Sequence, residues 1–313
     1  MRWKVLITDG LRPEGEAILA REAEVDNRNG IDAETLLQVI GEYHAVIVRS
    51  RTKITAAVLE AAANLKVVGR AGVGVDNIDL EAAKARGVTV VNAPQASTQA
   101  VAELALGLMF ALARRIPEAD ASMKRGEWRK KQLKGMELHG KTLGVIGMGR
   151  IGSRVGQLAK AIGMRVVGYD PLIPAEEITR RGAEPLAELD ALYAQADVIT
   201  LHVPLTPNTR GMLDAAAFAK MKPGVLLICA ARGGVIDEDA LYQALEAGHV
   251  GGAGLDVFAQ EPPGASPLVT HPRVVATPHI GAQTREAQTR VAEDIATEVL
   301  AALQGKPLRW RVV

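Results

Sequence analysis

The sequence predicts an α/β protein made of two doubly wound parallel-sheet domains. Short apolar runs rich in valine and isoleucine recur along the chain, and each precedes a turn and a segment with helical spacing. This alternation is typical of parallel strands that helices cover on both faces. With 313 residues the chain exceeds the usual size of one domain, so two such sheets are expected.

The first series of strands and helices fills the N-terminal third of the chain. Its strands are expected near residues 4–8, 45–48, 66–70 and 89–91. Its helices are expected near residues 13–22, 32–40, 55–62 and 79–85. Because strands and helices alternate throughout, this series predicts one complete doubly wound unit.

The second series follows a polar stretch at residues 123–140. Its strands are expected near residues 142–146, 165–169, 198–201, 225–228, 252–256 and 274–276. Two long helices, at residues 97–114 and 282–304, connect the series, and Pro117 closes the first of them. Because little sequence follows the second long helix, we expect it to return to the first unit. The predicted domains are a discontinuous one and an inserted one, with bounds of 1–98 plus 284–313 and 99–283.

Composition argues against a nucleic-acid or membrane partner. Lysine and arginine total 37 and aspartate and glutamate total 36, so no overall field attracts a polyanion. The longest apolar stretch, residues 104–113, spans half a bilayer at best, and the N-terminal apolar run is too short for a signal peptide. The single cysteine, Cys229, rules out a disulfide framework and a cysteine-based metal site. We therefore expect no metal and, by default, a cytoplasmic location.

A glycine-rich turn follows the first strand of the second series. Gly147, Gly149 and Gly152 have the GxGxxG spacing at a strand-to-helix junction. The first glycine permits a tight turn, the second lets the backbone approach a pyrophosphate, and the third lets the helix pack close to the strand. The helix N-terminus adds free N–H donors and partial positive charge. The turn predicts a dinucleotide site.

The next strand ends in Asp170, about twenty residues beyond the glycines, where a carboxylate can bind both ribose hydroxyls of adenosine. The same carboxylate repels a 2′-phosphate, and no arginine follows it directly, so NAD is favoured over NADP. Arg150, inside the turn, either is solvated at the helix start or contacts the pyrophosphate.

Three later strand-end segments carry charged groups: Arg232, Glu261 and His279. Because the carboxyl ends of parallel strands meet at one edge of a sheet, these side chains are expected to converge on one crevice. Each alone could be structural, as a turn cap, a surface glutamate or a buried histidine. His202, one strand earlier, is a competing histidine that we expect to line the cofactor crevice.

This set suits the reduction of a small anionic 2-oxo acid or the oxidation of a 2-hydroxy acid. A guanidinium binds a carboxylate with two parallel hydrogen bonds, and an imidazole donates or accepts a proton near neutral pH. Arg232 would therefore hold the substrate and His279 would transfer the proton. Glu261 would orient the ring and raise the pKa of His279, which keeps the acid form available for reduction.

Five segments in order resemble the D-isomer-specific 2-hydroxyacid dehydrogenases: GMGRIG, LHVPLTPNTRGML, AARGGVIDEDAL, GAGLDVFAQEP and TPHIGAQT. The resemblance covers nearly the whole chain. It implies a Rossmann NAD-binding domain inserted into a flavodoxin-like substrate domain, and a catalytic arginine, glutamate and histidine at the three positions above. It also implies that further residues line the cofactor crevice, namely Ile151, His202, Pro204, Thr209, Ala230, Asp256 and Gly281. Asp256 would face the nicotinamide amide.

Within the family, the segments VRSRTKIT and GRAGVGVDNIDL are most similar to those of D-3-phosphoglycerate dehydrogenases, enzymes of serine biosynthesis. This implies that Arg49, Ser50 and Arg51 bind the substrate phosphate, and that the amides of Val73 and Gly74 hold the carboxylate. Paired arginines beside a hydroxyl at a strand end make a credible phosphate site. A solvated loop is the alternative.

Two departures from the family pattern bear on substrate preference: Cys229 and Ser97 stand where the family commonly has asparagine. A glyoxylate or hydroxypyruvate reductase is therefore an alternative function, and a dinucleotide-sensing, corepressor-like interaction protein is one of another class. Family likeness also implies a homodimer or higher homo-oligomer. The short sequence after the second long helix predicts a form without an appended regulatory domain.

Overall fold

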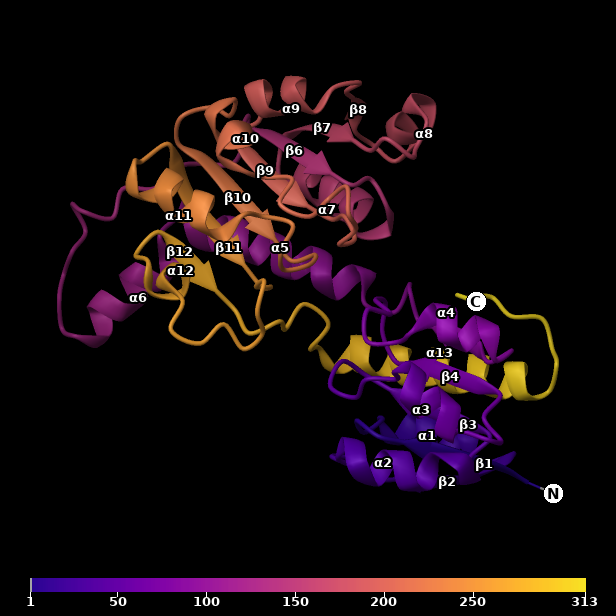
Figure 1. Ribbon diagram of the computed structural model, residues 1–313. Helices are drawn as coiled ribbons and strands as arrows, with labels where there is room; N and C mark the ends of the chain where they lie inside the picture. Colours follow the sequence, from indigo (N-terminus) through magenta and orange to yellow (C-terminus); the bar gives the residue numbers. More distant parts are fainter. Residues whose placement is uncertain (1) are drawn as a thin grey trace. The chain divides into compact units, whose positions relative to one another are not determined.

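The computed structural model describes residues 2–313, and the chain divides into two compact units. The first unit comprises the chain up to Ser97 together with Gln283–Val313, and the second comprises Thr98–Ala282. Each unit contains one parallel sheet with helices on both of its faces (Figure 1). The two chain segments of the first unit pack together through their apolar side chains.

The sheet of the first unit has the order β2-β1-β3-β4-β5, and all of its strand pairs are parallel. This is the flavodoxin-like order. The strands are β1 (Trp3–Ile7), β2 (Ala23–Asn27), β3 (Ala45–Val48), β4 (Val67–Arg70) and β5 (Thr89–Asn92). Strand β3 lies inside the sheet and is buried along its whole length, as expected for a strand covered on both faces.

Helices cover both faces of this first sheet. The elements are α1 (Pro13–Leu19), α2 (Ala33–Val39), the short 3₁₀ helix η1 (Ile40–Glu42), α3 (Ala56–Ala61), α4 (Leu80–Ala85) and α13 (Arg285–Leu303). Helix α13 packs on β4 and β5 and against α1, so one apolar cluster joins this face to the end of the chain. The opposite cluster contains side chains from α2, α3 and α4.

The sheet of the second unit has the order β12-β11-β10-β9-β6-β7-β8, again with parallel pairs throughout. The strands are β6 (Thr142–Ile146), β7 (Arg165–Tyr169), β8 (Glu184–Pro185), β9 (Val198–Leu201), β10 (Val225–Cys229), β11 (Val250–Leu255) and β12 (Val274–Ala276). The strand order reverses between β6 and β9, which is the crevice where doubly wound proteins bind dinucleotides.

Helices again occupy both faces of the second sheet. They are α5 (Thr98–Ala113), α6 (Ile116–Lys124), α7 (Arg150–Ala161), α8 (Ala175–Arg180), α9 (Leu189–Gln195), α10 (Ala215–Ala219), α11 (Glu238–Glu246) and α12 (Pro267–Thr270). Helices α5, α7 and α8 share one apolar cluster with the sheet, and α9, α10 and α11 share the other. The predicted fold class, two doubly wound parallel sheets, is confirmed.

Side-chain caps fix where several helices begin. Asp79 accepts a hydrogen bond from the amide of Ala82 at 2.9 Å, which satisfies one of the donors that a helix N-terminus leaves unpaired. The same arrangement recurs at other helix starts, with the capping residues Asp32, Thr55, Asp214, Asp237 and Thr284.

Three elements differ from the sequence-based prediction. Strands β2 and β8 were not expected, because both lie at sheet edges and expose polar side chains. We expected Pro117 to end the long helix, whereas it lies in the first turn of a separate helix, α6. Proline is tolerated there because the first-turn amides have no acceptor within the helix.

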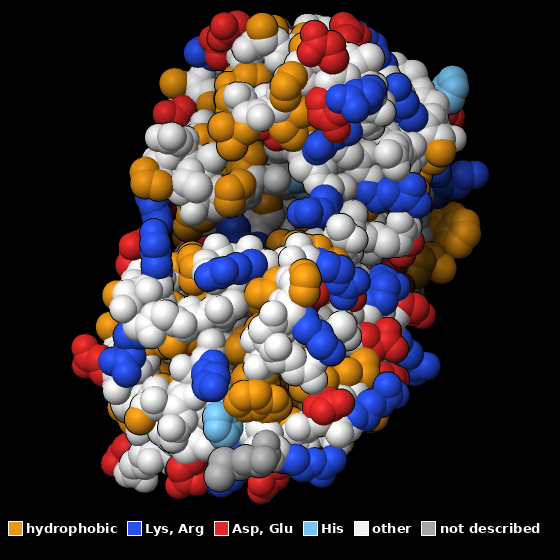
Figure 2. All heavy atoms as spheres, turned by 90° about the vertical axis from the view of Figure 1, so that its right-hand side faces the viewer, with side chains coloured by type: hydrophobic (Ala, Val, Ile, Leu, Met, Phe, Trp, Pro, Cys, Tyr) orange, Lys and Arg blue, Asp and Glu red, His pale blue; other side chains and the backbone are white. Residues whose placement is uncertain are grey.

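Charged side chains of both signs lie on the face that Figure 2 shows, with lysine and arginine more frequent across its middle. Among residues 2–313, no helix has both the length and the apolar character needed to cross a bilayer.

Candidate active site

The glycine turn after β6 excludes a side chain at two of its three glycines and leaves free space at the other. Gly147 has a φ of +90°, and a Cβ there would come within 2.6 Å of the carbonyl oxygen of His202. A Cβ on Gly152 would lie 2.0 Å from the carbonyl oxygen of Gly147. A Cβ on Gly149, in contrast, would meet no heavy atom of residues 2–313 within 4 Å. The first and third glycines therefore serve the fold, and the second leaves open space.

The N-terminus of α7 offers unpaired donors beside that open space. Within residues 2–313, the amides of Gly149, Arg150 and Ile151 have no hydrogen-bond acceptor. Arg150 is exposed at the helix start, and Ile151 packs on the apolar cluster beneath. Such a helix end attracts a pyrophosphate through its N–H groups and its partial positive charge.

Asp170 lies at the end of β7 and braces the turn. Its carboxylate accepts hydrogen bonds from the amide of Met148 at 2.9 Å and from the amide of Leu172 at 3.0 Å. Each carboxylate oxygen keeps a lone pair for a further donor, as the ribose hydroxyls of NAD require. The turn, the free amides and this carboxylate fit a bound dinucleotide.

The loop after β9 carries three of the predicted cofactor residues. His202 follows the strand directly, and its Nε2 lies 2.8 Å from the hydroxyl of Thr200. Burial lowers the pKa of His202 to about 3, so this ring is neutral at physiological pH. The hydroxyl of Thr209 donates to the carbonyl of Pro204 at 2.6 Å and closes the loop. A ring with so low a pKa does not hold an added proton near neutral pH, so His202 suits a crevice wall better than a proton-transfer site.

His279 and Glu261 are in direct contact. Nδ1 of His279 lies 2.7 Å from Oε2 of Glu261, while Oε1 accepts the amide of Phe258 at 3.2 Å. Because a carboxylate only accepts, Nδ1 carries the hydrogen and Nε2 is the nitrogen left for a substrate. The imidazole is 46% exposed, which leaves it accessible to a ligand.

Electrostatics tune this pair in opposite directions. The Glu261 hydrogen bond raises the pKa of His279, against the effects of burial and of the Arg232 charge. Burial raises the pKa of Glu261, but the hydrogen bond and charge of His279 outweigh it, so that pKa lies below its usual value. Arg232 influences both groups, and its guanidinium donates to the carbonyl of Ala231 at 2.6 Å. The structure thus brings the three predicted catalytic side chains together after β10, β11 and β12.

Asp256 holds the loop that carries His279. Its side chain is buried, and it accepts the amides of Ile280 and Gly281 at 2.8 Å and the hydroxyl of Thr277 at 2.6 Å. His279 between them has a φ of +52°, in the left-handed region. A Cβ on Gly281 would lie 3.1 Å from Oδ2 of Asp256, which is tighter than an ordinary contact. We expected Asp256 on the nicotinamide side and did not foresee this role.

Cys229 and Ala230 pack inside the protein at the end of β10. The thiol of Cys229 is buried, its Sγ contacts the carbonyl of Arg232 at 3.7 Å, and burial raises its pKa to about 11. A thiol with that pKa remains protonated and is a poor nucleophile. Ala230 is half-buried between this thiol and the arginine loop.

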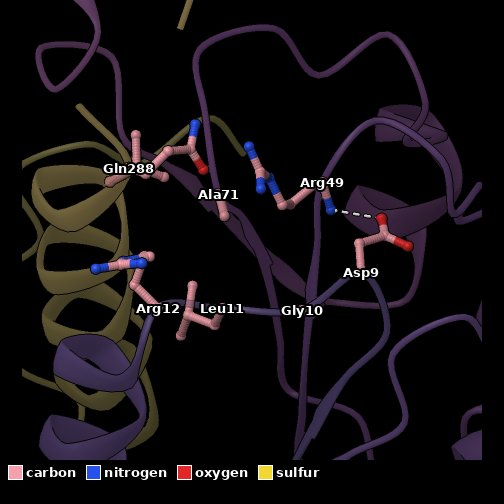
Figure 3. Close-up of a pocket in the computed structure, with 8 residues that line it drawn as sticks. Asp9, Gly10, Leu11, Arg12, Arg49, Ala71 and Gln288 are labelled. Atoms are coloured by element: carbon pink, nitrogen blue, oxygen red, sulfur yellow. Dashed lines mark hydrogen bonds between the residues drawn. The ribbon is translucent and has the colours of Figure 1, made fainter. Parts of the chain in front are cut away.

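In the first unit, Arg49 lines a pocket of about 210 Å³ with Asp9, Arg12 and Gln288 (Figure 3). Arg51 is instead engaged by protein groups, at 2.9 Å from Asp9 and 2.7 Å from the carbonyl of Thr8.

The other predicted substrate-binding residues of the first unit differ in what they offer a ligand. The hydroxyl of Ser50 accepts from Arg70 at 3.0 Å. Within residues 2–313 the amides of Val73 and Gly74 have no acceptor, so they can bind an anion.

Sequence reasoning missed Arg12 and Gln288 as pocket residues. Gln288 lies on α13, more than two hundred residues from Arg49 along the chain, and no local motif marks it. Arg12 lies at the end of the loop after β1, directly before α1, so its position in a strand-to-helix loop could have indicated it.

The fold and this site define a class of nicotinamide-dependent oxidoreductase, and comparison with known proteins identifies the family. The model of the D-isomer specific 2-hydroxyacid dehydrogenase, NAD binding domain, matches residues 106–281. The chain therefore belongs to the D-isomer specific 2-hydroxyacid dehydrogenase family, and the second unit contains its NAD-binding domain. The resemblance seen in the sequence is confirmed.

Individual relatives share this fold and sequence. The chain is 51% identical to D-3-phosphoglycerate dehydrogenase of Methanocaldococcus jannaschii over 97% of its own length and 58% of that protein. It thus spans little more than half of that relative.

A glyoxylate reductase structure from Paecilomyes thermophila has a TM-score of 0.91 at 31% identity, covering 99% of this chain and 98% of that one. D-lactate dehydrogenase of Aquifex aeolicus, solved with NAD and lactic acid, has a TM-score of 0.85 at 31% identity, with 96% of each chain covered.

Proposed function

We propose that the protein oxidises D-3-phosphoglycerate to 3-phosphohydroxypyruvate with NAD, or acts on a closely related D-2-hydroxy acid. The observation that carries the proposal is the contact between His279 and Glu261, beside Arg232 and in the same unit as the glycine turn. Bound NAD supplies the acceptor for the hydride that leaves C2 of the substrate. The chain must therefore bind the acid, take up its hydroxyl proton and stabilise the developing carbonyl.

His279 is proposed as the general base. Its neutral Nε2 takes the hydroxyl proton while Nδ1–H remains hydrogen-bonded to Glu261. The positive charge that forms on the ring therefore faces a carboxylate at 2.7 Å. Arg232 is proposed to hold the substrate carboxylate and polarise the oxygen at C2. In the reverse reaction the protonated His279 returns the proton.

The first unit is proposed to recognise the rest of the acid. The free amides of Val73 and Gly74 suit a carboxylate, and the guanidinium of Arg49 suits the phosphate. Ser50 and Arg51 belong to the same predicted phosphate segment. The high identity to D-3-phosphoglycerate dehydrogenases supports this choice of substrate.

Steady-state rates with 3-phosphoglycerate and with D-glycerate, followed by NADH absorbance, test the proposal. We expect kcat/KM to favour the phosphorylated acid, and Arg49→Gln to reduce that preference by about ten-fold, because a charge-assisted contact contributes about 1.5–3 kcal/mol. Equal rates with both acids in the wild type would exclude phosphoglycerate as the substrate.

A second function, glyoxylate or hydroxypyruvate reduction, is favoured by the likeness to the glyoxylate reductase structure. It needs the same His279, Glu261 and Arg232 but no phosphate contact. Rates of NADH oxidation with glyoxylate and hydroxypyruvate distinguish it, because a reductase of this kind would be insensitive to Arg49→Gln.

A homodimer is proposed through the second unit. Helices α5 and α6 and the segment after them expose large apolar side chains, namely Phe110, Ile116, Met123 and Trp128, the last at 78% exposure. Light scattering of the wild type and of Trp128→Ser tests this, with a monomeric wild type as the contrary result. The cytoplasmic location stays a prediction.

A further inference from the structure

The turn that follows β3 is held by a buried carboxylate. Asp9, two residues after the end of β1, has a side chain only 5% exposed. It accepts the amide of Arg49 at 2.7 Å, the amide of Thr52 at 3.1 Å and the hydroxyl of Thr52 at 2.6 Å. Both ends of the four-residue turn 49–52 are therefore fixed to one side chain that lies forty residues earlier in the chain.

The carbonyls of the same two residues are held from the other direction. Nδ2 of Asn77 donates to the carbonyl of Arg49 at 2.8 Å and to the carbonyl of Thr52 at 2.6 Å. Asp9 thus accepts hydrogen bonds from the N–H groups of Arg49 and Thr52, and Asn77 donates hydrogen bonds to their C=O groups. Four backbone groups of two residues have partners, which leaves the turn little freedom to move.

Arg51 balances the charge of Asp9. Its guanidinium lies 2.9 Å from Oδ1 of Asp9 and donates to the carbonyls of Thr8 at 2.7 Å and Ile31 at 2.9 Å. A guanidinium with three such acceptors has few donors left for a ligand. Arg49, two residues earlier, differs because its guanidinium remains available to a ligand.

Arg49 is half-buried, and its guanidinium has no hydrogen-bond acceptor within residues 2–313. Burial lowers its pKa, although the charge of Asp9 opposes this. Figure 3 shows its side chain projecting toward Gln288 and Ala71, while its own amide faces Asp9 on the other side. The free cation therefore points into a pocket of about 210 Å³, which is large enough for a phosphate group.

We propose that Asp9 and Asn77 are positioning residues that aim Arg49 at the anionic group of the substrate, and that Arg51 neutralises Asp9 and does not contact the substrate. The inference rests on the proposed use of Arg49 for an anionic acid. It assigns substrate binding to Arg49 and a supporting role to Arg51. It also places two residues outside the predicted site in the machinery of substrate recognition.

A double-mutant cycle tests the proposal in the full chain. We expect Asp9→Asn to raise KM for 3-phosphoglycerate by about ten-fold, with kcat and the KM for NAD within about two-fold of wild type. If Asp9 acts through Arg49, Asp9→Asn adds no further increase when Arg49 is already Gln. Likewise, Arg51→Gln adds none when Asp9 is already Asn.

Asp26→Asn is the matched control, because Asp26 is also a carboxylate of the first unit fixed by Tyr43 and Arg28 but does not line the pocket. Its KM should stay at the wild-type value. Independent, additive effects of Asp9→Asn and Arg49→Gln would overturn the proposal, as would a loss in kcat with KM unchanged.

Two further measurements keep the test decisive. If Asp9→Asn does not fold, Thr52→Val removes a single bond to Asp9, and the same cycle with Arg49→Gln applies. If the wild type shows no preference for 3-phosphoglycerate, the proposed substrate is wrong, and the cycle is read from inhibition by inorganic phosphate. Non-additive loss of that inhibition supports the positioning role, and additive loss refutes it.

Discussion

The two units place their functional groups at the carboxyl ends of similar parallel sheets, but they prepare those groups differently. In the second unit the proposed binding groups are largely backbone amides of a glycine turn, and the proposed reactive side chains, His279 and Glu261, contact each other directly. In the first unit Asp9 and Arg51, near the pocket, form an ion pair with each other. Asp9 bonds only the backbone amide of Arg49, so the guanidinium of Arg49 stays available to a ligand.

This difference teaches that a strand-end charge is not by itself a binding group. Arg49 and Arg51 are two residues apart, follow the same strand and have the same chemistry. Their availability to a ligand differs because only the guanidinium of Arg51 contacts Asp9 and the carbonyl of Thr8. If the comparison holds, changes in the second unit affect turnover or cofactor binding, while those in the first affect the KM for the acid.

The largest expected effect is that of His279→Ala. Removing the general base should lower kcat by roughly 10³-fold, within the usual range for acid–base catalysis, and leave the affinity for NAD nearly unchanged. Turnover is followed by NADH absorbance and NAD binding by calorimetry. Retention of wild-type turnover would remove His279 from the mechanism and with it the assignment of chemistry to the second unit.

The next effect in size is a selective loss of cofactor binding in Gly149→Val. Because a Cβ there meets no heavy atom of residues 2–313 within 4 Å, the variant should fold, with a melting temperature at most a few degrees below that of the wild type for the loss of a glycine N-cap. Its side chain would occupy the space above the helix end, so the Kd for NAD should rise by about ten-fold or more, at 1.4 kcal/mol per factor of ten.

Gly107→Val is the control for this experiment, since Gly107 is exposed on α5 and also has free space for a Cβ. It should bind NAD normally. Equal NAD affinity in Gly149→Val would show that the dinucleotide does not approach this turn.

A smaller effect, but a diagnostic one, is expected for Glu261→Gln. The carboxylate raises the pKa of His279, and oxidation needs the neutral ring, so oxidation is lost as pH falls through that raised pKa. The variant should keep oxidising at lower pH than the wild type, with kcat reduced by about ten-fold because the ring cation loses its partner. For reduction, which needs the protonated ring, activity should disappear at a lower pH than in the wild type. An unchanged pH profile would contradict the coupling of this pair.

Sequence patterns were sufficient for the fold class and for features with local causes. The glycine spacing predicted a turn at a strand-to-helix junction, and the alternation of apolar runs predicted two parallel sheets. Strand β2 was not predicted, because an edge strand with the sequence AEVDN buries too little apolar surface to show a clear pattern. The separate helix α6 was not predicted, because a proline is compatible both with the end of one helix and with the start of the next.

The first-unit site was harder to predict for a physical reason. Whether an arginine is available to a ligand depends on partners that the fold brings near, such as Asp9 for Arg51, forty-two residues away in sequence. The role of Asp256 was missed for the same reason, since its acceptors serve a loop more than twenty residues later. No motif spacing encodes such contacts.

The left-handed backbone of His279 has a consequence for stability. A non-glycine residue with a φ of +52° is held in a sparsely populated conformation, at a cost of order 1 kcal/mol or more. Glycine adopts the same conformation without steric strain, which offsets the chain entropy that glycine loses on folding, so an inactive His279→Gly protein should withstand heat about as well as the active one. Thermal robustness alone would then not preserve the imidazole, so strain and activity share one residue.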